Sequence, residues 1–133
     1  MRTNDHAANV VAIEELLRAY GLVTNYRVCA RPQEIDGHVI MPGDMVAIST
    51  VLAGRDPAAY EAPEEVRLDR RPSHVSMGNG IHRCLGQHLA RRERQTAFEE
   101  FLGAIPQFGL APEFKPPFLL SGILHINALQ LVW

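Results

Sequence analysis

The chain has 133 residues, which is enough for one domain or for part of a larger one. Hydrophobic residues make up 47% of the chain and charged residues 21%, as in ordinary globular proteins. The net charge of -2 argues against a general nucleic-acid binder, because such proteins are usually basic. We therefore expect a globular fold and no nucleic-acid partner.

No targeting signal is visible in the sequence. The first ten residues, MRTNDHAANV, lack the apolar run of a signal peptide. Nowhere do about 18 apolar residues run together, as a membrane-spanning helix requires. The expectation is a cytoplasmic protein without a membrane partner, in which Cys29 and Cys84 are reduced thiols.

The first predicted element is an amphipathic helix over residues 7–20. Its apolar residues recur at spacings of three and four, at Val10, Ile13, Leu17 and Tyr20. Gly21 follows as a stop signal. From residue 26 to 52, short apolar runs alternate with turn residues, and the β-branched run VAISTV favours a strand. This region predicts a small antiparallel sheet.

Residues 53–83 contain many glycines and prolines with little periodicity, which predicts a long irregular segment. Irregular segments of this length are usually functional or disordered. A second helix is expected at roughly residues 85–103, and residues 116–133 predict a hairpin around Ser121 and Gly122. The buried stripe predicted for the second helix is Leu89, Ala90, Ala97, Phe101 and Leu102, with Arg91, Arg92 and Arg94 around it.

The sharpest local feature is the segment MGNGIHRCLG, residues 77–86. Its glycines allow the backbone to bend tightly and to approach a flat ligand. Cys84 lies just before the second helix, where free N–H groups and the helix dipole favour a negatively charged ligand atom. Such a cysteine could bind iron or zinc, or could be a free thiol in a turn, the commoner case for a lone cysteine. A zinc site could use His82, Cys84, His88 and Cys29, but their spacing matches no common zinc pattern.

This segment resembles the haem-ligand loop of the cytochrome P450 family, whose usual form is F-G-x-G-x-H-x-C-x-G. The matching positions are Gly78, Gly80, His82, Cys84 and Gly86. The first position departs from the pattern, because Met77 replaces the usual phenylalanine. The flexible thioether of methionine can fill similar space, so we expect the replacement to affect the electronic properties of the iron and not the shape of the loop.

Three further features follow the family pattern in order and spacing. The first helix contains Glu15 and Arg18 as E-x-x-R, a pair that on its own is most often solvated. In the stretch PEEVRLDRR, Arg70 matches the arginine of the family's F-D-x-x-R, with Arg71 as the alternative. Residues 53–57, AGRDP, resemble A-N-R-D-P with Gly54 in place of asparagine. The stretches EELLR, LGQHLARRE and LVW are similar to bacterial terpene hydroxylases of the camphor-oxidising kind.

The resemblance implies an α+β fold, the C-terminal part of the P450 fold: E-x-x-R helix, small antiparallel sheet, meander, Cys-ligand loop, proximal helix and terminal hairpin. It implies haem b as the cofactor, with Cys84 as the iron ligand. The remaining implied roles are haem-propionate contacts for Arg27 and His82, cofactor contacts for Met77, Gly78 and Gly86, substrate contacts for Val23 and Ile123, structural roles for Glu15, Arg18 and Arg70, and ferredoxin binding for Arg91.

The implied reaction is hydroxylation of a small apolar molecule such as a terpenoid, using O2, NAD(P)H and an iron–sulfur ferredoxin. Family members are several times longer, and the helix that covers the other haem face precedes the E-x-x-R helix. We therefore expect residues 1–133 to be a single partial domain that is inactive alone. The alternatives are a haem- or metal-binding module without turnover and a non-functional gene fragment.

Overall fold

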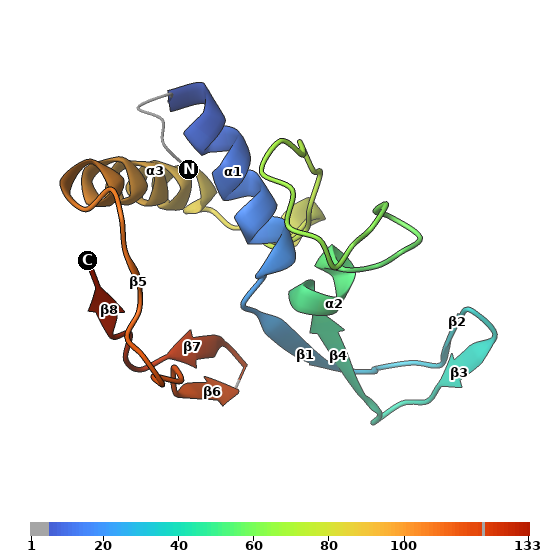
Figure 1. Ribbon diagram of the computed structural model, residues 1–133. Helices are drawn as coiled ribbons and strands as arrows, with labels where there is room; N and C mark the ends of the chain where they lie inside the picture. The colour runs from blue at the N-terminus through green and yellow to red at the C-terminus, as the bar shows by residue number, and fades with distance from the viewer. Residues whose placement is uncertain (1–5, 121) are drawn as a thin grey trace.

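The computed structural model describes residues 6–120 and 122–133. Its helices are α1 (His6–Ala19), α2 (Thr50–Gly54) and α3 (Gln87–Ala104), with a short 3-10 helix η1 (Gly80–His82). Its strands are β1 (Thr24–Val28), β2 (Gln33–Ile35), β3 (His38–Ile40), β4 (Met45–Ser49), β5 (Gly109–Leu110), β6 (Phe118–Leu120), β7 (Leu124–Ile126) and β8 (Leu131–Val132). Figure 1 shows α1 at the centre, with the strands extending as arms on either side.

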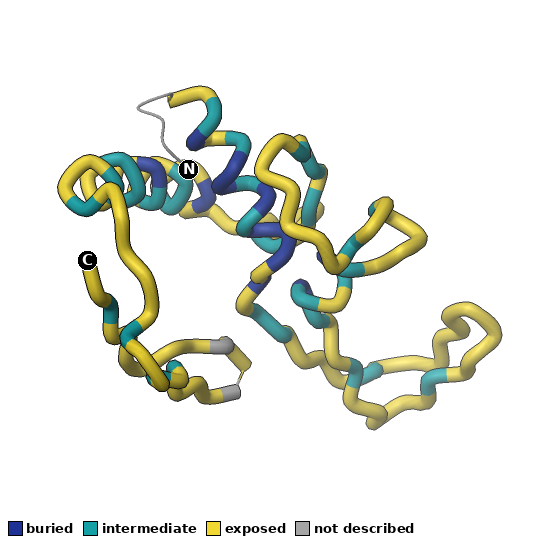
Figure 2. Tube along the Cα trace, viewed as in Figure 1, coloured by how far each residue is buried: buried dark blue, intermediate teal, exposed yellow. Residues whose placement is uncertain are grey.

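The core is small and is centred on α1. Within the described part of the chain, the buried apolar residues are Ala12, Ile13, Leu17 and Ala19, all on this helix. Figure 2 shows most of the buried backbone along α1 and at the start of α3. The predicted helix over residues 7–20 is therefore confirmed, and its central apolar positions form the core.

Four two-stranded antiparallel pairs make up the β structure. β1 pairs with β4 from Thr24 opposite Ser49, and β2 pairs with β3 in a hairpin. These pairs confirm the antiparallel structure predicted for residues 26–52. β6 pairs with β7 as the predicted terminal hairpin, whose Ser121 lies outside the described residues. The pairing of β5 with β8 was not predicted, because two-residue strands carry no periodic signal.

The strand predicted from VAISTV ends earlier than expected. Its last two residues belong to α2, because Ser49 caps that helix by accepting a hydrogen bond from the Leu52 N–H at 3.3 Å. Residues 55–79 have no regular secondary structure, which confirms most of the irregular segment predicted over residues 53–83, but its first two residues belong to α2 and residues 80–82 form η1. Among the described residues, no helix is long and apolar enough to cross a membrane.

The buried stripe predicted for α3 is wrong. Leu89 is 64% exposed, and Ala97 and Phe101 are also exposed. The residues of α3 that are buried are polar, Gln87 and Gln95. The helix packs against α1 through hydrogen-bonding side chains, so its apolar side has too few partners within the described chain to be covered.

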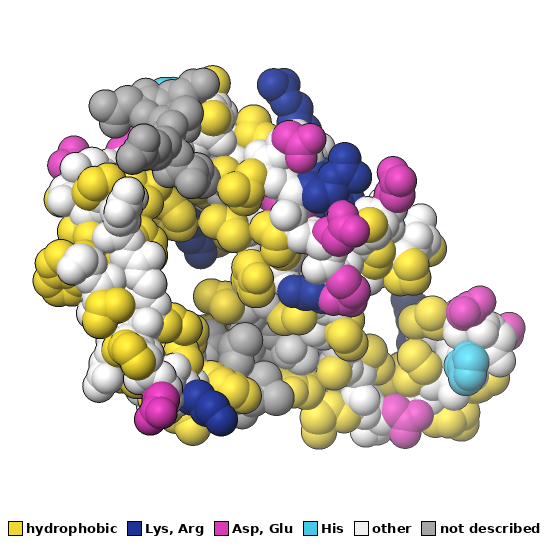
Figure 3. All heavy atoms as spheres, in the orientation of Figure 1, with side chains coloured by type: hydrophobic (Ala, Val, Ile, Leu, Met, Phe, Trp, Pro, Cys, Tyr) yellow, Lys and Arg dark blue, Asp and Glu magenta, His cyan; other side chains and the backbone are white. Residues whose placement is uncertain are grey.

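The molecule exposes more surface than its mass predicts. Its accessible surface is 10003 Å², whereas a compact monomer of 14.8 kDa exposes about 7000 Å². Hydrophobic side chains account for much of the visible surface of the arms (Figure 3). The most exposed are Leu85 and Ile81, at 99% and 96%: Ile81 lies within the Cys84 loop, and Leu85 follows Cys84 directly. This open arrangement leaves the glycine-rich loop accessible.

Candidate functional site

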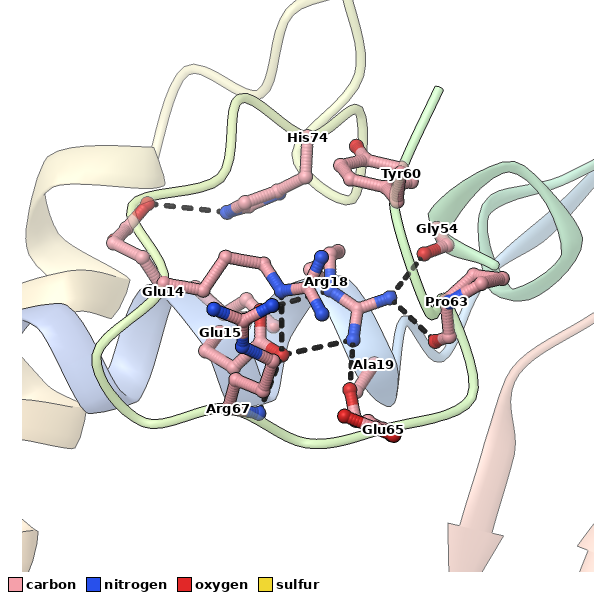
Figure 4. Close-up of polar contacts among 12 residues, drawn as sticks. Glu14, Glu15, Arg18, Ala19, Gly54, Tyr60, Pro63, Glu65, Arg67 and His74 are labelled. Carbon is pink, nitrogen blue, oxygen red and sulfur yellow. Dashed lines mark hydrogen bonds and ion pairs between the residues drawn. The ribbon is translucent and has the colours of Figure 1, made fainter. Parts of the chain in front are cut away.

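A buried ion cluster on α1 anchors the region around the site. The side chains of Glu15 and Arg18 are both fully buried, and Arg18 Nε and Nη2 each donate a hydrogen bond of 2.8 Å to the Glu15 carboxylate. Figure 4 shows the two side chains facing each other and the surrounding irregular segment. The pair is therefore a two-pronged internal ion pair, and the solvated helix pair that is the usual case for E-x-x-R does not form.

Arg18 also holds the irregular segment through its backbone. Its Nη1 donates to the carbonyl oxygens of Gly54 and Pro63, at 2.5 and 2.9 Å, and its Nη2 donates to Glu65 O at 2.9 Å. A Cβ atom at Gly54 would lie 2.1 Å from the Arg18 carbonyl oxygen. In this chain, a residue with a side chain at position 54 would therefore require the backbone of α1 or α2 to shift.

Arg70 joins the same cluster from the irregular segment. Its Nε lies 3.3 Å from Glu15 Oε1, an ion pair without hydrogen-bond geometry. Its Nη1 donates to Glu61 O at 2.8 Å. The Arg67 N–H also donates to Glu15 Oε1, at 2.9 Å. Burial by itself would raise the pKa of Glu15, but the hydrogen bonds from Arg18 and Arg67 outweigh it and hold that pKa below the usual value.

The loop before α3 has a fixed backbone shape. Gly78 has φ of +75° and Gly80 of +58°, in the left-handed region that favours glycine. A Cβ atom at Gly78 would lie 2.8 Å from His82 O. The Cys84 N–H donates to Met77 O at 2.7 Å and closes the loop on itself. Cys84 is exposed and lies just before Gly86, which caps α3.

The loop borders a hollow of about 230 Å³ between the Cys84 segment and β1. Its lining comprises Val23, Asn25, Thr50, Ser76, Met77, Gly78, His82 and Cys84. Arg27 is not part of this lining. Because side chains alternate between the two faces of a strand, Arg27 lies on the same face as Val23 and Asn25. Val23 pairs with Ile123 in an isolated antiparallel bridge, which brings together the two predicted substrate contacts.

These residues are suited to binding a flat, mostly apolar cofactor that carries carboxylate substituents. Cys84 offers an exposed sulfur ligand, and the glycines keep the backbone beside it free of side chains. The exposed side chains of Ile81 and Leu85 provide apolar surface next to it. His82 adds a hydrogen-bonding ring at the hollow. The arrangement is suited to a haem macrocycle, whose apolar ring needs an axial ligand and whose propionates need donors.

The zinc alternative gains no support from the geometry. Within residues 6–120 and 122–133, no three His, Cys, Asp or Glu side chains lie close enough together to share a metal ion. Cys29 instead lies after β1, where its Sγ–H donates to Arg31 O at 2.9 Å. Both cysteines are free, as the sequence predicts.

Arg91 lies in a second cluster that sequence reasoning missed. Its Nε and Nη2 donate to the two carboxylate oxygens of Glu14 at 2.6 and 3.0 Å, and His74 Nε2 lies 3.1 Å from Glu14 Oε2. Burial by itself would raise the pKa of Glu14, but hydrogen bonds from Arg91 and His74 outweigh it and lower that pKa. Glu14 and Arg91 are 77 residues apart, so no spacing signal could have paired them.

Comparison with known proteins assigns the fold to a family. The family model for cytochrome P450 matches residues 10–105. A solved structure of cytochrome P450 CYP101C1 superposes with a TM-score of 0.88 and 39% identity, covering 97% of this chain and 34% of that chain. A buried Glu-x-x-Arg cluster and a cysteine loop before a helix therefore lie on a P450 fold. The chain belongs to the cytochrome P450 family, whose cofactor is haem b.

Curated relatives agree with this assignment. The chain is 36% identical over 131 residues to the probable cytochrome P450 127A1 of Sinorhizobium fredii, covering 98% of this chain and 32% of the relative. It is 33% identical over 127 residues to the vitamin D3 dihydroxylase of Streptomyces griseolus, covering 92% and 31%. The chain spans about a third of the length of these relatives.

Proposed function

We propose that this chain is the haem-binding, C-terminal part of a haem-thiolate monooxygenase, with Cys84 as the iron ligand. The observation that carries the proposal is the position of Cys84: exposed, in a loop closed by its own N–H on Met77 O, next to the hollow along β1. When haem is bound, it supplies the oxygen-activating chemistry of the family. The protein supplies the ligand, the orientation and the surrounding charge.

Two side chains near the hollow are proposed to hold the haem propionates. His82 lines the hollow, and Arg27 extends from the same face of β1 as Asn25. A guanidinium and an imidazole each donate hydrogen bonds to carboxylates. Met77, Gly78 and Gly86 are proposed cofactor contacts: Met77 and Gly78 line the hollow, and Gly86 leaves open space before α3.

The proposed substrate is a small apolar molecule such as a terpenoid, hydroxylated with O2 and NAD(P)H. The bridge between Val23 and Ile123 places two apolar residues at the edge of a second hollow of about 350 Å³. This hollow adjoins the first one, because both are lined by Val23, Ser76 and Met77. The similarity to a protein named vitamin D3 dihydroxylase supports an apolar substrate class.

The proposed electron donor is an acidic iron–sulfur ferredoxin, bound at the arginines around α3. The family resemblance places Arg91 on this surface, and the structure shows its guanidinium donating two hydrogen bonds to the Glu14 carboxylate. Arg83 and Arg92 are exposed close to it in the sequence. Basic surface residues steer an acidic partner through long-range attraction.

The second candidate function is haem binding without turnover by this chain alone. It is favoured by the exposure of Cys84, Ile81 and Leu85, which leaves a haem at this loop open to water. Iron content and NAD(P)H-linked product formation separate the two candidates: a module binds iron but forms no product. We regard residues 1–133 as a partial domain, whichever candidate holds.

The test of the proposed function is the spectrum of the reduced carbon monoxide complex of the haem-loaded chain. A thiolate ligand gives a strongly red-shifted Soret band. Replacing Cys84→His should abolish the shift, whereas Cys29→Ser should leave it unchanged, because Cys29 lies after β1, in a separate contact with Arg31 O. A shifted band that survives Cys84→His would show that another residue holds the iron.

A further inference from the structure

Glu14 is the centre of a hydrogen-bonded network that connects three parts of the chain. Arg91, on α3, grips both of its carboxylate oxygens. His74, in the irregular segment, contacts the same carboxylate with a side chain that is only 2% exposed. Figure 4 shows His74 reaching toward Glu14, away from the Glu15 and Arg18 cluster. Adjacent residues of α1 thus support two separate clusters.

The proton positions at His74 follow from its partners. The Ser76 N–H donates to His74 Nδ1 at 3.3 Å, so that nitrogen accepts. In a neutral imidazole the other nitrogen, Nε2, then carries the hydrogen and donates to Glu14. A second tether acts at the same place, because Ser76 Oγ donates to Leu17 O at 2.7 Å. The residue just before Met77 is therefore fixed to α1 on two sides.

The network also reaches the other end of the loop. Gln87 Oε1 accepts from Arg91 Nη1 at 3.0 Å and from Arg83 Nε at 2.9 Å. Arg83 immediately precedes Cys84, so the residue before the proposed iron ligand is connected through Gln87 and Arg91 to Glu14. The loop from Met77 to Cys84 is thus held at both ends by one carboxylate.

We infer that Glu14, acting through His74 and Arg91, positions the loop that presents Cys84. This role is distinct from that of Glu15, which ties α1 to the irregular segment through Arg18 and Arg67. The inference rests on the proposed function only for the identity of what Cys84 binds. The holding of the loop can be measured without haem.

The test is hydrogen exchange of the Cys84 amide in the monomeric fraction of the 133-residue chain, because this N–H is bonded to Met77 O only while the loop is closed. Glu14→Gln and His74→Leu should accelerate its exchange by about tenfold or more, the effect of losing a hydrogen bond to a charged group. The Tyr20 amide, bonded to Leu16 O on α1, should change little. Arg91→Lys, which keeps the charge but loses the two-pronged grip, should have an intermediate effect.

The matched control is Glu99→Gln. Glu99 contacts His6 and Gln95, so it is also a carboxylate between α1 and α3, but it does not reach the loop. Its replacement should leave the Cys84 amide unchanged. The inference is overturned if the wild-type Cys84 amide is unprotected, if Glu14→Gln acts no more strongly than Glu99→Gln, or if all amides accelerate equally.

A spectroscopic readout separates this inference from the proposed function. In the haem-loaded chain, Glu14→Gln and His74→Leu should reduce the fraction with the red-shifted Soret band, and Glu99→Gln should not. A wild-type chain that never shows this band, while the exchange pattern holds, overturns the iron-ligand role of Cys84 and supports the positioning of the loop. A normal band with unchanged exchange in all variants overturns the positioning role alone.

Discussion

The glycines of the Cys84 loop differ in whether the structure leaves room for a side chain at their positions. Gly78 has a left-handed φ and a Cβ position 2.8 Å from a carbonyl oxygen, whereas Gly86 has φ of -82° and open space around it. Both match the family motif equally well in the sequence. Only the structure shows that Gly78 is constrained by sterics within this chain, while the surroundings of Gly86 leave room for a side chain.

We expect Gly78→Ala to open the loop. An L-residue in the left-handed region costs about 1–2 kcal/mol, and the clash with His82 O adds to it. Hydrogen exchange of the Cys84 amide should become faster, because its bond to Met77 O is lost when the loop opens, and urea unfolding should shift to lower concentration. Gly86→Ala serves as the control and should cost less than about 1 kcal/mol. Equal effects of the two replacements would contradict the steric explanation.

Glu15 carries a charge inside the only apolar cluster that is buried among the described residues. Its carboxylate is compensated by Arg18, Arg70 and the Arg67 N–H. Because its pKa is lowered in the folded state, this carboxylate stabilises the fold at pH values above its unfolded pKa of about 4.3. That contribution is lost as the pH falls through the lower folded pKa.

We therefore expect Glu15→Gln to lower the free energy of unfolding at pH 7 by about 3–5 kcal/mol, because Arg18 is left as a buried unpaired charge. The loss of stability with falling pH should also be smaller in the variant than in the wild type. Urea unfolding between pH 7 and acidic pH measures both. The control is Glu64→Gln, since Glu64 is 73% exposed in its pair with Arg55 and should contribute at most about 1 kcal/mol.

At the scale of the elements, α3 makes its contacts to α1 through polar side chains. Gln87, Arg91 and Gln95 recur every four residues and lie on one face of the helix. Gln95 Nε2 contacts the His6 ring, and Arg91 grips Glu14. Arg91, on this face, therefore forms a contact within the protein, whereas Arg92 is exposed to solvent.

This difference predicts how charge reversals on α3 act on electron transfer. If an acidic ferredoxin docks here, Arg92→Glu should slow electron transfer and increase its dependence on partner concentration, while the Soret band stays normal. Arg91→Glu should slow it too, but should also disturb the band because Glu14 loses its partner. The rate should fall with salt, since charges beyond about 8 Å are screened at physiological ionic strength. A rate independent of salt and of Arg92 would argue against this docking surface.

At the scale of the whole molecule, the described chain buries few apolar side chains. Met45, at the start of β4, is 73% exposed, and Phe118 and Trp133, in the C-terminal region of β5–β8, are 69% and 82% exposed. The relatives are about three times longer than the chain. Exposed apolar surface on this scale leads to association unless further protein covers it.

We expect the 133-residue chain, expressed alone, to associate or aggregate, to retain haem weakly and to hydroxylate nothing. A haem at Cys84 would be covered by this chain on one face only, so water would reach the other face. Size-exclusion chromatography, haem content and product analysis with a ferredoxin system and a panel of terpenes test this. One product formed per NAD(P)H consumed would show that this chain suffices for catalysis.

The family, the two long helices α1 and α3, the antiparallel strands and the cysteine loop were predictable from the sequence, because each depends on a local pattern, whereas α2 and η1 were not predicted. Periodicity defines α1, and the spacing from Gly78 to Gly86 defines the loop. The approach of Arg70 to Glu15 was indicated by the family resemblance, since the E-x-x-R pair alone is ambiguous, but the contacts of this pair with Gly54, Pro63 and Arg67 were not predicted.

Only the tertiary structure decided which residues meet across long separations. His74 and Arg91 follow Glu14 by 60 and 77 residues in the sequence, and no local pattern links either of them to it. The buried face of α3 was mispredicted for the same reason: its apolar stripe is visible in the sequence, but burial depends on whether a partner surface exists. Here α1 offers hydrogen-bonding groups, so the polar face of α3 is the one that packs.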